Sequence, residues 1–104
     1  MSDGILTNMA KAELIFRRRR ELADGAIIEG VAWLLPQPVE GSEHLYKYRL
    51  FYGYPGQRII GYDNERGKGD HKHHYDDESS YTFSNPQQVW SDFVTDVLNE
   101  RKDK

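Results

Sequence analysis

The pair Asp24-Gly25, which lies between two extended runs, restricts the fold more than any other feature of this sequence. Asp-Gly between runs of strand-forming residues is the strongest short signal for a tight β-hairpin. Opposed charges and opposed aromatic rings each contribute roughly 0.2–1 kcal/mol across such a hairpin. Residues 10–22 also contain good helix formers, so a helix is the rival interpretation. The coherent pairing favours two strands, with Leu22 facing Ile27, Arg20 facing Glu29, Arg18 facing Val31 and Phe16 facing Trp33.

Two further strands are expected, over residues 45–54 and 58–62. The first alternates aromatic and aliphatic side chains with Lys47, Arg49 and Phe51, so one face is aromatic and the other partly basic. Two prolines end the preceding strand near Leu35. Pro55-Gly56 favours a type II turn, which suits a two-residue hairpin poorly, so a longer loop is expected between the two strands.

A C-terminal helix is predicted over residues 85–100. Asn85 is suited to the N-cap, Pro86 to the first turn, and Gln88 to a bond back to the cap. Apolar residues recur at spacings of three and four, which is typical of an amphipathic helix: Val89, Trp90, Phe93, Val94, Val97 and Leu98. The expected fold class is α+β, an antiparallel sheet of four to five strands with this helix packed on one face.

The chain is interpreted as a single domain over residues 1–104. Residues 1–10 are expected to be a flexible tail, 11–62 the strands, 63–78 a polar functional loop and 79–84 a short strand. Cysteine is absent, which excludes disulfides, thiolate metal sites and a cysteine nucleophile. No apolar run approaches the roughly 18 residues of a membrane span, and the N-terminus does not have the pattern of a signal peptide. We therefore expect a cytoplasmic protein without membrane contact.

The most polar part of the chain is the segment from Asp63 to His74. These twelve residues hold three of the four histidines, together with three acids, three bases and two glycines. The segment has no apolar side chain to bury, and Gly67 and Gly69 loosen its backbone. It is therefore either a solvated loop or a site where acids, bases and imidazoles meet a ligand.

Several motifs resemble those of one family of small prokaryotic proteins. They are the order Asp24-Gly25, then residues 33–39 (WLLPQPV) and 47–50 (KYRL), then residues 62–73 (YDNERGKGDHKH) and 81–83 (YTF). Together they are similar to the toxin components of the TumE family over about residues 12–99. The resemblance implies the toxin half of a prokaryotic toxin–antitoxin pair, with a DNA-binding antitoxin as its cognate partner. In size and in its sheet with a packed helix, the chain also looks like the RelE/ParE-type toxins.

The polar segment contains the groups that RNA cleavage requires. A phosphodiester is cut by a base near the 2′-hydroxyl, an acid at the leaving oxygen and cations at the phosphate. His71 and His73 share a side if the segment is extended, and Glu65 could replace one of them as base. Arg66 and Lys68 are the candidate cations. These five are the candidate catalytic residues, and the candidate substrate-binding residues are Lys47, Tyr48, Arg49, Asp63, Asn64 and Asp70.

A metal site is a separate hypothesis, because no cofactor is required by the ribonuclease interpretation. A divalent metal would find oxygen and nitrogen donors at short steps in Asp70, His71, His73 and His74, and Asp76, Asp77 and Glu78 could complete the coordination shell. None of these spacings is diagnostic of a particular ion.

Three classes of function therefore stay open. The first is a toxin that acts on RNA or on translation as an endoribonuclease, with RNA or the ribosome as a partner. The second is a toxin that only binds a protein target, such as a topoisomerase, through its charged segment. The third is a metal-binding or adaptor domain without toxicity. In either toxin reading, an acidic antitoxin segment would cover the basic run from Arg17 to Arg20 and the polar segment. A homodimer within that complex is a further expectation.

Overall fold

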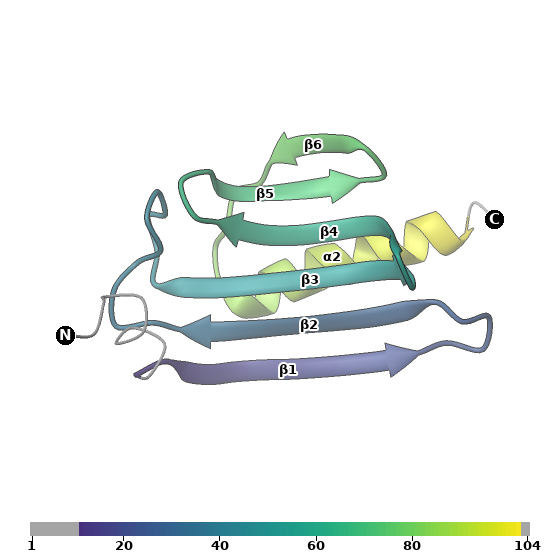
Figure 1. Ribbon diagram of the computed structural model, residues 1–104, viewed down its shortest axis with the longest axis horizontal. Coiled ribbons are helices and arrows are strands. Elements are labelled where there is room, and N and C mark those ends of the chain that lie inside the picture. The colour runs from purple at the N-terminus through teal and green to yellow at the C-terminus, as the bar shows by residue number, and fades with distance from the viewer. Residues whose placement is uncertain (1–10, 103–104) are drawn as a thin grey trace.

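In the computed structural model, which describes residues 11–102, one antiparallel sheet of six strands carries a single helix on one side (Figure 1). The strands lie in the order of the sequence, so every neighbouring pair is antiparallel. The α+β class and the C-terminal helix are confirmed, whereas the expectation of four to five strands is wrong. The elements are β1 (Glu13–Glu21), β2 (Ile27–Leu34), β3 (Tyr46–Tyr54), β4 (Gln57–Glu65), β5 (Gly69–His74), β6 (Asp77–Ser80) and α2 (Pro86–Lys102).

The first hairpin forms as expected, but its register differs by one residue. Glu21 pairs with Ile27, and Arg19 instead of Arg20 lies opposite Glu29. The reason is a three-residue loop. The backbone N–H of Leu22 donates to the carbonyl of Ala26, which leaves residues 23–25 as the loop, with Gly25 at a φ of 90°. The ion pair across the hairpin is therefore Arg19 Nε to Glu29 Oε1, at 3.3 Å.

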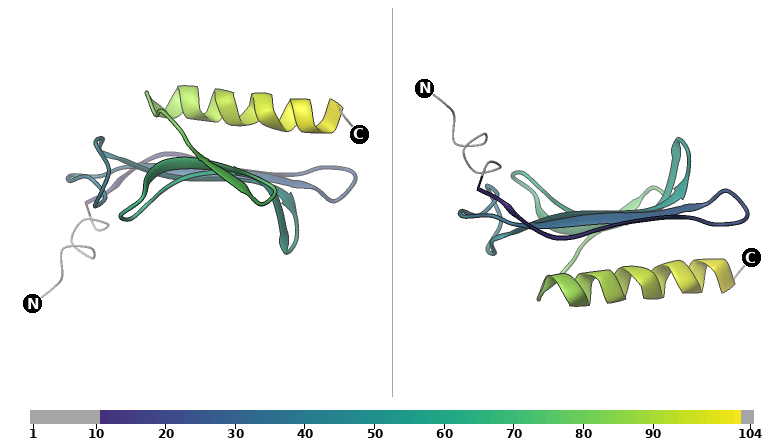
Figure 2. Two further views of the ribbon diagram at one scale, coloured as in Figure 1. Left: turned by 90° about the horizontal axis from the view of Figure 1, so that it is seen from above. Right: turned by 90° about the horizontal axis from the view of Figure 1, so that it is seen from below.

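The turn between β3 and β4 is shorter than expected. Tyr54 pairs with Gln57, so Pro55 and Gly56 alone form the loop. A register shift between Tyr52 and Gly53 bends the strands before the turn. The hairpin tip consequently curves away from the side that carries the helix (Figure 2).

The segment predicted as a polar loop over residues 63–78 is mostly strand, so that prediction is wrong. β4 continues to Glu65, β5 covers Gly69–His74, and β6 begins at Asp77. Gly67, at a φ of 80°, lies in the turn that reverses the chain between β4 and β5. Polar side chains do not prevent strand formation here, because the backbone of this segment pairs with a strand on each side. The short strand expected over 79–84 lies earlier, at 77–80.

The helix begins where it was predicted and ends two residues later. The side-chain oxygen of Asn85 accepts the backbone N–H of Gln88 at 2.7 Å, so the N-cap is confirmed. Val89, Phe93 and Val97 are buried against the sheet. Leu98 was expected in the same stripe, but it is 62% exposed because it lies on the side of the helix away from the sheet. Within residues 11–102, no helix is long and apolar enough to span a membrane.

The two faces of the sheet differ in what covers them. The helix covers one face, where Tyr48, Leu50, Tyr52, Ile60 and Tyr62 form the core with Phe93. Among the described residues, no helix lies over the other face, as both views in Figure 2 show. We call this second side the open face. Residues directly opposite each other on paired strands share a face, so one row of the open face reads Arg17, Val31, Arg49, Asp63, His71 and Ser80.

Candidate functional site: an imidazole–carboxylate cluster on the open face

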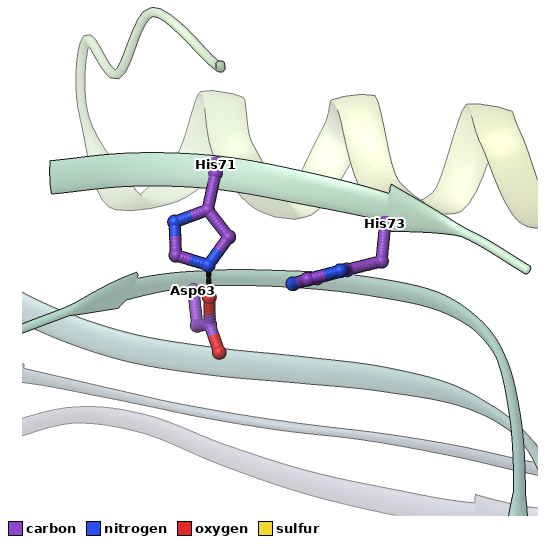
Figure 3. A group of neighbouring side chains, drawn as sticks. All are labelled: Asp63, His71 and His73. Carbon is purple, nitrogen blue, oxygen red and sulfur yellow. Dashed lines mark ion pairs between the residues drawn. The ribbon is translucent and has the colours of Figure 1, made fainter. Parts of the chain in front are cut away.

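Two histidines and an aspartate meet on the open face. Each of Asp63, His71 and His73 offers one ligand atom, and these atoms all lie within 4.8 Å of one another. The two imidazole rings have centroids 5.0 Å apart and are nearly perpendicular, at 81°. Figure 3 shows His71 and His73 on β5, with Asp63 below them on β4. We call these three residues the central cluster.

Local folding explains why these residues meet. The β4–β5 turn is centred on Gly67, so Asp63 and His71 become direct cross-strand partners. Along β5, alternate side chains point to opposite faces, which brings His73 to the same side as His71. The expectation that these two histidines share a side in an extended segment is confirmed.

His71 is the most buried member of the central cluster, with 5% of its side chain exposed. Its Nδ1 lies 3.1 Å from the backbone oxygen of Gly69, and because a carbonyl only accepts, this nitrogen carries the proton. Its Nε2 lies 2.8 Å from Asp63 Oδ1, but the two atoms do not have hydrogen-bond geometry, and neither has another such partner in the described structure. A buried pair of this kind requires an explanation.

His73 differs from His71 in having both ring nitrogens without a hydrogen-bond partner among residues 11–102. Partial burial, and next the positive charge of Arg58, lower the pKa of His73 below its ordinary value of 6.5. At neutral pH the ring is therefore uncharged, and its lone pair can accept a proton or bind a metal.

Three charged side chains surround the central cluster. The carboxylates of Glu78 and Glu65 lie 3.6 Å and 3.8 Å from His71 Nε2, and both are about half exposed. The Arg58 side chain lies over Gly61, where a methyl group would come within 2.8 Å of its Cδ. The sequence indicated Glu78 only as a residue that could complete a metal coordination shell, and it did not indicate Arg58. The pairing of His73 with Gly61 and Glu78, which follows only from the strand register, places both side chains beside the central cluster.

A hollow of about 270 Å³ lies on the open face beside the central cluster. It is lined by Arg17, Arg18, Arg19 and Arg49 together with Glu29, and Val31 and Phe51 are among the apolar residues of its wall. Arg49 is the cross-strand neighbour of Asp63, so the hollow and the central cluster adjoin. Three of the four arginines, Arg17, Arg19 and Arg49, belong to the open face and outnumber Glu29, which pairs with Arg19, so the hollow favours an anionic ligand.

The predicted cations of the polar segment lie at its turn. Lys68 Nζ is 3.7 Å from Glu65 Oε1, and through Glu65 it approaches the central cluster. Arg66 is turned away from that cluster, because its Nε donates to Glu40 Oε1 at 2.8 Å. The backbone N–H of Gly67 donates to the Glu40 carbonyl, so this amide is occupied within the protein. Lys47 is exposed on the face of β3 that carries Arg49.

Other predicted site residues lie on the helix side of the sheet. The Tyr48 hydroxyl donates to Asp70 Oδ1 at 2.6 Å, and His44 Nε2 lies 2.9 Å from the same oxygen. Burial and this hydrogen bond raise the pKa of Tyr48. Asn64 is buried, and its amide bonds to the backbone of Tyr48 and of Tyr46.

The set of four metal ligands proposed from the sequence is divided between the two faces. His71 and His73 lie on the open face. Asp70 lies on the helix side with His44, and His74 contacts Glu100 of α2 at 2.9 Å. Asp63 takes their place as the oxygen donor.

The fold and the site together define a class of protein. It is a small α+β protein with a six-stranded antiparallel sheet, and the central cluster lies on the open face of that sheet. This chain belongs to the TumE family, because a family model described as Toxin TumE matches residues 3–101. No curated protein and no solved structure shows significant similarity to it. The family resemblance seen in the sequence motifs is thus confirmed, and it identifies the chain as a member of a toxin family.

Proposed function

We propose that this protein is the toxin of a prokaryotic toxin–antitoxin pair and that it cleaves RNA on its open face. One observation carries the proposal: the central cluster adjoins a hollow lined by three arginines on the same uncovered face. Cleavage of a phosphodiester requires a group that accepts a proton and positive charge at the phosphate. Membership of the toxin family supports the biological role.

The arginines of the hollow are suited to hold the RNA backbone. A guanidinium binds two phosphate oxygens at once in a fixed geometry. Arg49 is the nearest of the three to the central cluster along the row of paired strands, so it would hold the phosphate next to Asp63. Trp33 lies on the same face with the Arg17 guanidinium 5.7 Å from its ring centre. It offers an aromatic surface on which a base can stack.

Proton transfer is assigned to the accessible groups around His71. In cleavage by the 2′-hydroxyl, the oxygen attacks phosphorus, loses its proton to a base, and the bond to the 5′-oxygen breaks as that oxygen gains a proton. Glu65 and Glu78 have 58% and 44% of their side chains exposed, so an RNA hydroxyl can reach them. His73 is the accessible imidazole. His71 itself is too buried to approach a polynucleotide without the mediation of its neighbours.

The experiment is an RNA cleavage assay with purified protein, paired with growth measurements on cells that express it. His73→Ala should abolish cleavage and growth arrest, because it removes a member of the central cluster. His74→Ala is the matched control: it changes the next residue of the same strand, whose side chain faces α2. Equal activity of wild type and His73→Ala would overturn the proposal.

A toxin that only binds a protein target, without catalysis, would give different results in the same two assays. Growth arrest would then survive His73→Ala and be lost on charge reversal at Arg49, and RNA would remain intact.

An antitoxin partner follows from the proposed role. We infer that it is a DNA-binding protein with an acidic segment, because such a segment would neutralise the arginines of the open face. A gene adjacent to that of the toxin that encodes a small helix-turn-helix protein and restores growth would support this partner.

A further inference from the structure

We propose that Asp63, His71 and His73 bind a divalent transition-metal ion on the open face. Two imidazoles and one carboxylate are a donor set that suits Zn²⁺, Mn²⁺, Fe²⁺ and Ni²⁺ far better than Mg²⁺ or Ca²⁺, which take oxygen ligands. The three ligand atoms lie within 4.8 Å of one another, so a small rotation of the side chains would bring all three into contact with one ion. The ion site does not depend on the proposed function; only a role for the ion in RNA cleavage does.

The orientation of His71 supports the site. Its Nδ1–H is held by the Gly69 carbonyl, so in the neutral ring the lone pair lies on Nε2, in the interior of the central cluster. Metal-binding histidines almost always have their second nitrogen fixed in this way by a carbonyl or carboxylate. His44 shows the contrast: its Nδ1 accepts the backbone N–H of Tyr46 and its Nε2 is occupied by Asp70.

The contact between His71 and Asp63 has the geometry of two ligands of one ion. Nε2 and Oδ1 are 2.8 Å apart, yet they do not form a hydrogen bond, and both atoms are buried. Two ligand atoms that are each about 2.0–2.1 Å from the same ion, and that subtend an angle of about 90–109° at it, lie about 2.8–3.4 Å apart. The observed separation is at the lower end of this range. Figure 3 shows that the His73 ring also extends toward Asp63, so that it can supply the third ligand.

The surrounding charge favours a dication. With neutral imidazoles, Asp63, Glu65 and Glu78 bring three negative charges to one side of the sheet, and all three carboxylates lie within 4 Å of His71 Nε2. Glu78 is better placed than Glu65 to become a fourth ligand, because its carboxylate lies 3.6 Å from His71 Nε2. Three protein ligands with further positions left for water or substrate are typical of catalytic metal sites. An ion there would add positive charge beside Arg49, where the phosphate of the proposed substrate would lie.

The test is calorimetric titration of the metal-stripped, full-length protein with ZnCl₂, without RNA. We expect one ion per chain for the wild type. His73→Ala and Asp63→Asn should each weaken binding at least tenfold, since each removes a ligand. Circular dichroism checks the fold of both variants, and Asp63→Asn keeps the shape of the side chain. Titration with Co²⁺ provides a second readout, because its visible absorption reports nitrogen and oxygen ligands directly.

His74→Ala is the matched control, because His74 belongs to the same histidine-rich strand but faces the helix. It should bind Zn²⁺ as the wild type does. Equal weakening by His74→Ala and His73→Ala would show adventitious binding to a histidine-rich surface and overturn the site, as would unchanged binding in Asp63→Asn. RNA cleavage that persists in a chelator would also overturn the ion's role while leaving the proposed ribonuclease intact. One-to-one Zn²⁺ binding without any RNA cleavage would support the metal site and overturn the proposed ribonuclease.

Discussion

His44 and His71 illustrate how the neighbours of an imidazole determine what it can do. Both rings are largely buried and both lie near a carboxylate. In His44 each nitrogen has a hydrogen-bond partner, and the ring stacks on Phe83 with centroids 4.0 Å apart, so it belongs to the packed interior. In His71 one nitrogen is held by a carbonyl, and the other faces carboxylates without a hydrogen bond. The difference separates a histidine that belongs to the packing from one whose free lone pair suits it to the proposed site.

Asn64 is expected to contribute to stability, because its amide satisfies two backbone groups of β3. Asn64→Ala would leave the Tyr48 N–H and the Tyr46 carbonyl unsatisfied in the interior. We expect the free energy of unfolding to fall by about 1–3 kcal/mol. Urea denaturation measures the loss, with exposed Lys68→Ala as the control, which should change it by no more than about 0.5 kcal/mol. An equal effect of both substitutions would contradict this assignment.

Asp24 should make stability depend on pH. A hydrogen bond from the Ala26 backbone, followed by those from Tyr54 and Arg101, lowers the pKa of Asp24 below 3.8. A carboxyl whose pKa is lower in the folded protein stabilises it above the ordinary value, and this contribution is lost as the pH falls through the folded pKa. Thermal unfolding from pH 7 to pH 2 should therefore show wild type more stable than Asp24→Asn at neutral pH, with the difference disappearing below pH 3.8. A constant difference would contradict the linkage.

At the scale of the elements, the sequence predicted strands and helix better than the turns between them. Alternation along residues 45–54 and the stripe at Val89, Phe93 and Val97 reflect burial directly, and both predictions were confirmed. Turn length depends on bulges and on the sign of φ, which the residue types alone do not determine. The Asp-Gly loop has three residues and the Pro-Gly loop has two, the opposite of the expectation.

The candidate site was likewise predicted only in part from the sequence. The sequence indicated His71 and His73, because they are two residues apart in a polar segment. It assigned Asp63 to substrate binding and did not place it in one cluster with the two histidines, because that placement requires a hairpin centred on Gly67 and not a loop. Asp70 and His74 were included with them because they are close in the sequence, but alternation along a strand separates such neighbours onto opposite faces. The sequence grouped Glu78 with Asp76 and Asp77 as residues that could complete a metal shell, but only the pairing of β5 with β6 shows that Glu78 is the one opposite His73.

Two glycines, on β2 and on β4, should respond differently to the same substitution. At Gly30, a methyl group would meet Leu50 at 2.6 Å and Trp90 at 2.8 Å in the packed layer under the helix. Gly30→Ala should therefore cost about 1–3 kcal/mol of stability. At Gly61, the methyl group would meet only the flexible Arg58 side chain, so Gly61→Ala should unfold within about 0.5 kcal/mol of wild type.

Gly61→Ala should instead reduce RNA cleavage, because it displaces Arg58 from its position next to His73. Urea denaturation and the cleavage assay, applied to both variants, test the pair. A large loss of stability in Gly61→Ala would show that Arg58 is a rigid part of the packing.

At the scale of the whole molecule, one face of the sheet carries the core and the other carries the central cluster and the arginine-lined hollow. This division makes the antitoxin interface predictable. Arg17→Glu should weaken the toxin–antitoxin complex, because Arg17 lines the hollow on the open face. Arg20→Glu is the matched control, since Arg20 is exposed on the same strand and alternates to the opposite side.

Affinity measurements on the two variants check this prediction, and hydrogen exchange with and without antitoxin locates the contact. Protection confined to α2, with equal affinity of both variants, would contradict an interface on the open face.

The strictly sequential strand order has a consequence for synthesis. Every strand pairs with the one that precedes it in the chain, so the hairpins can assemble in succession as the polypeptide leaves the ribosome. The helix that shields the apolar side is translated last. Until then Tyr48, Leu50, Tyr62 and their neighbours have no cover, and the nascent sheet cannot reach its final stability. A chain built in this order can complete its fold only after α2 has been translated, which leaves an interval in which an antitoxin made earlier can meet it.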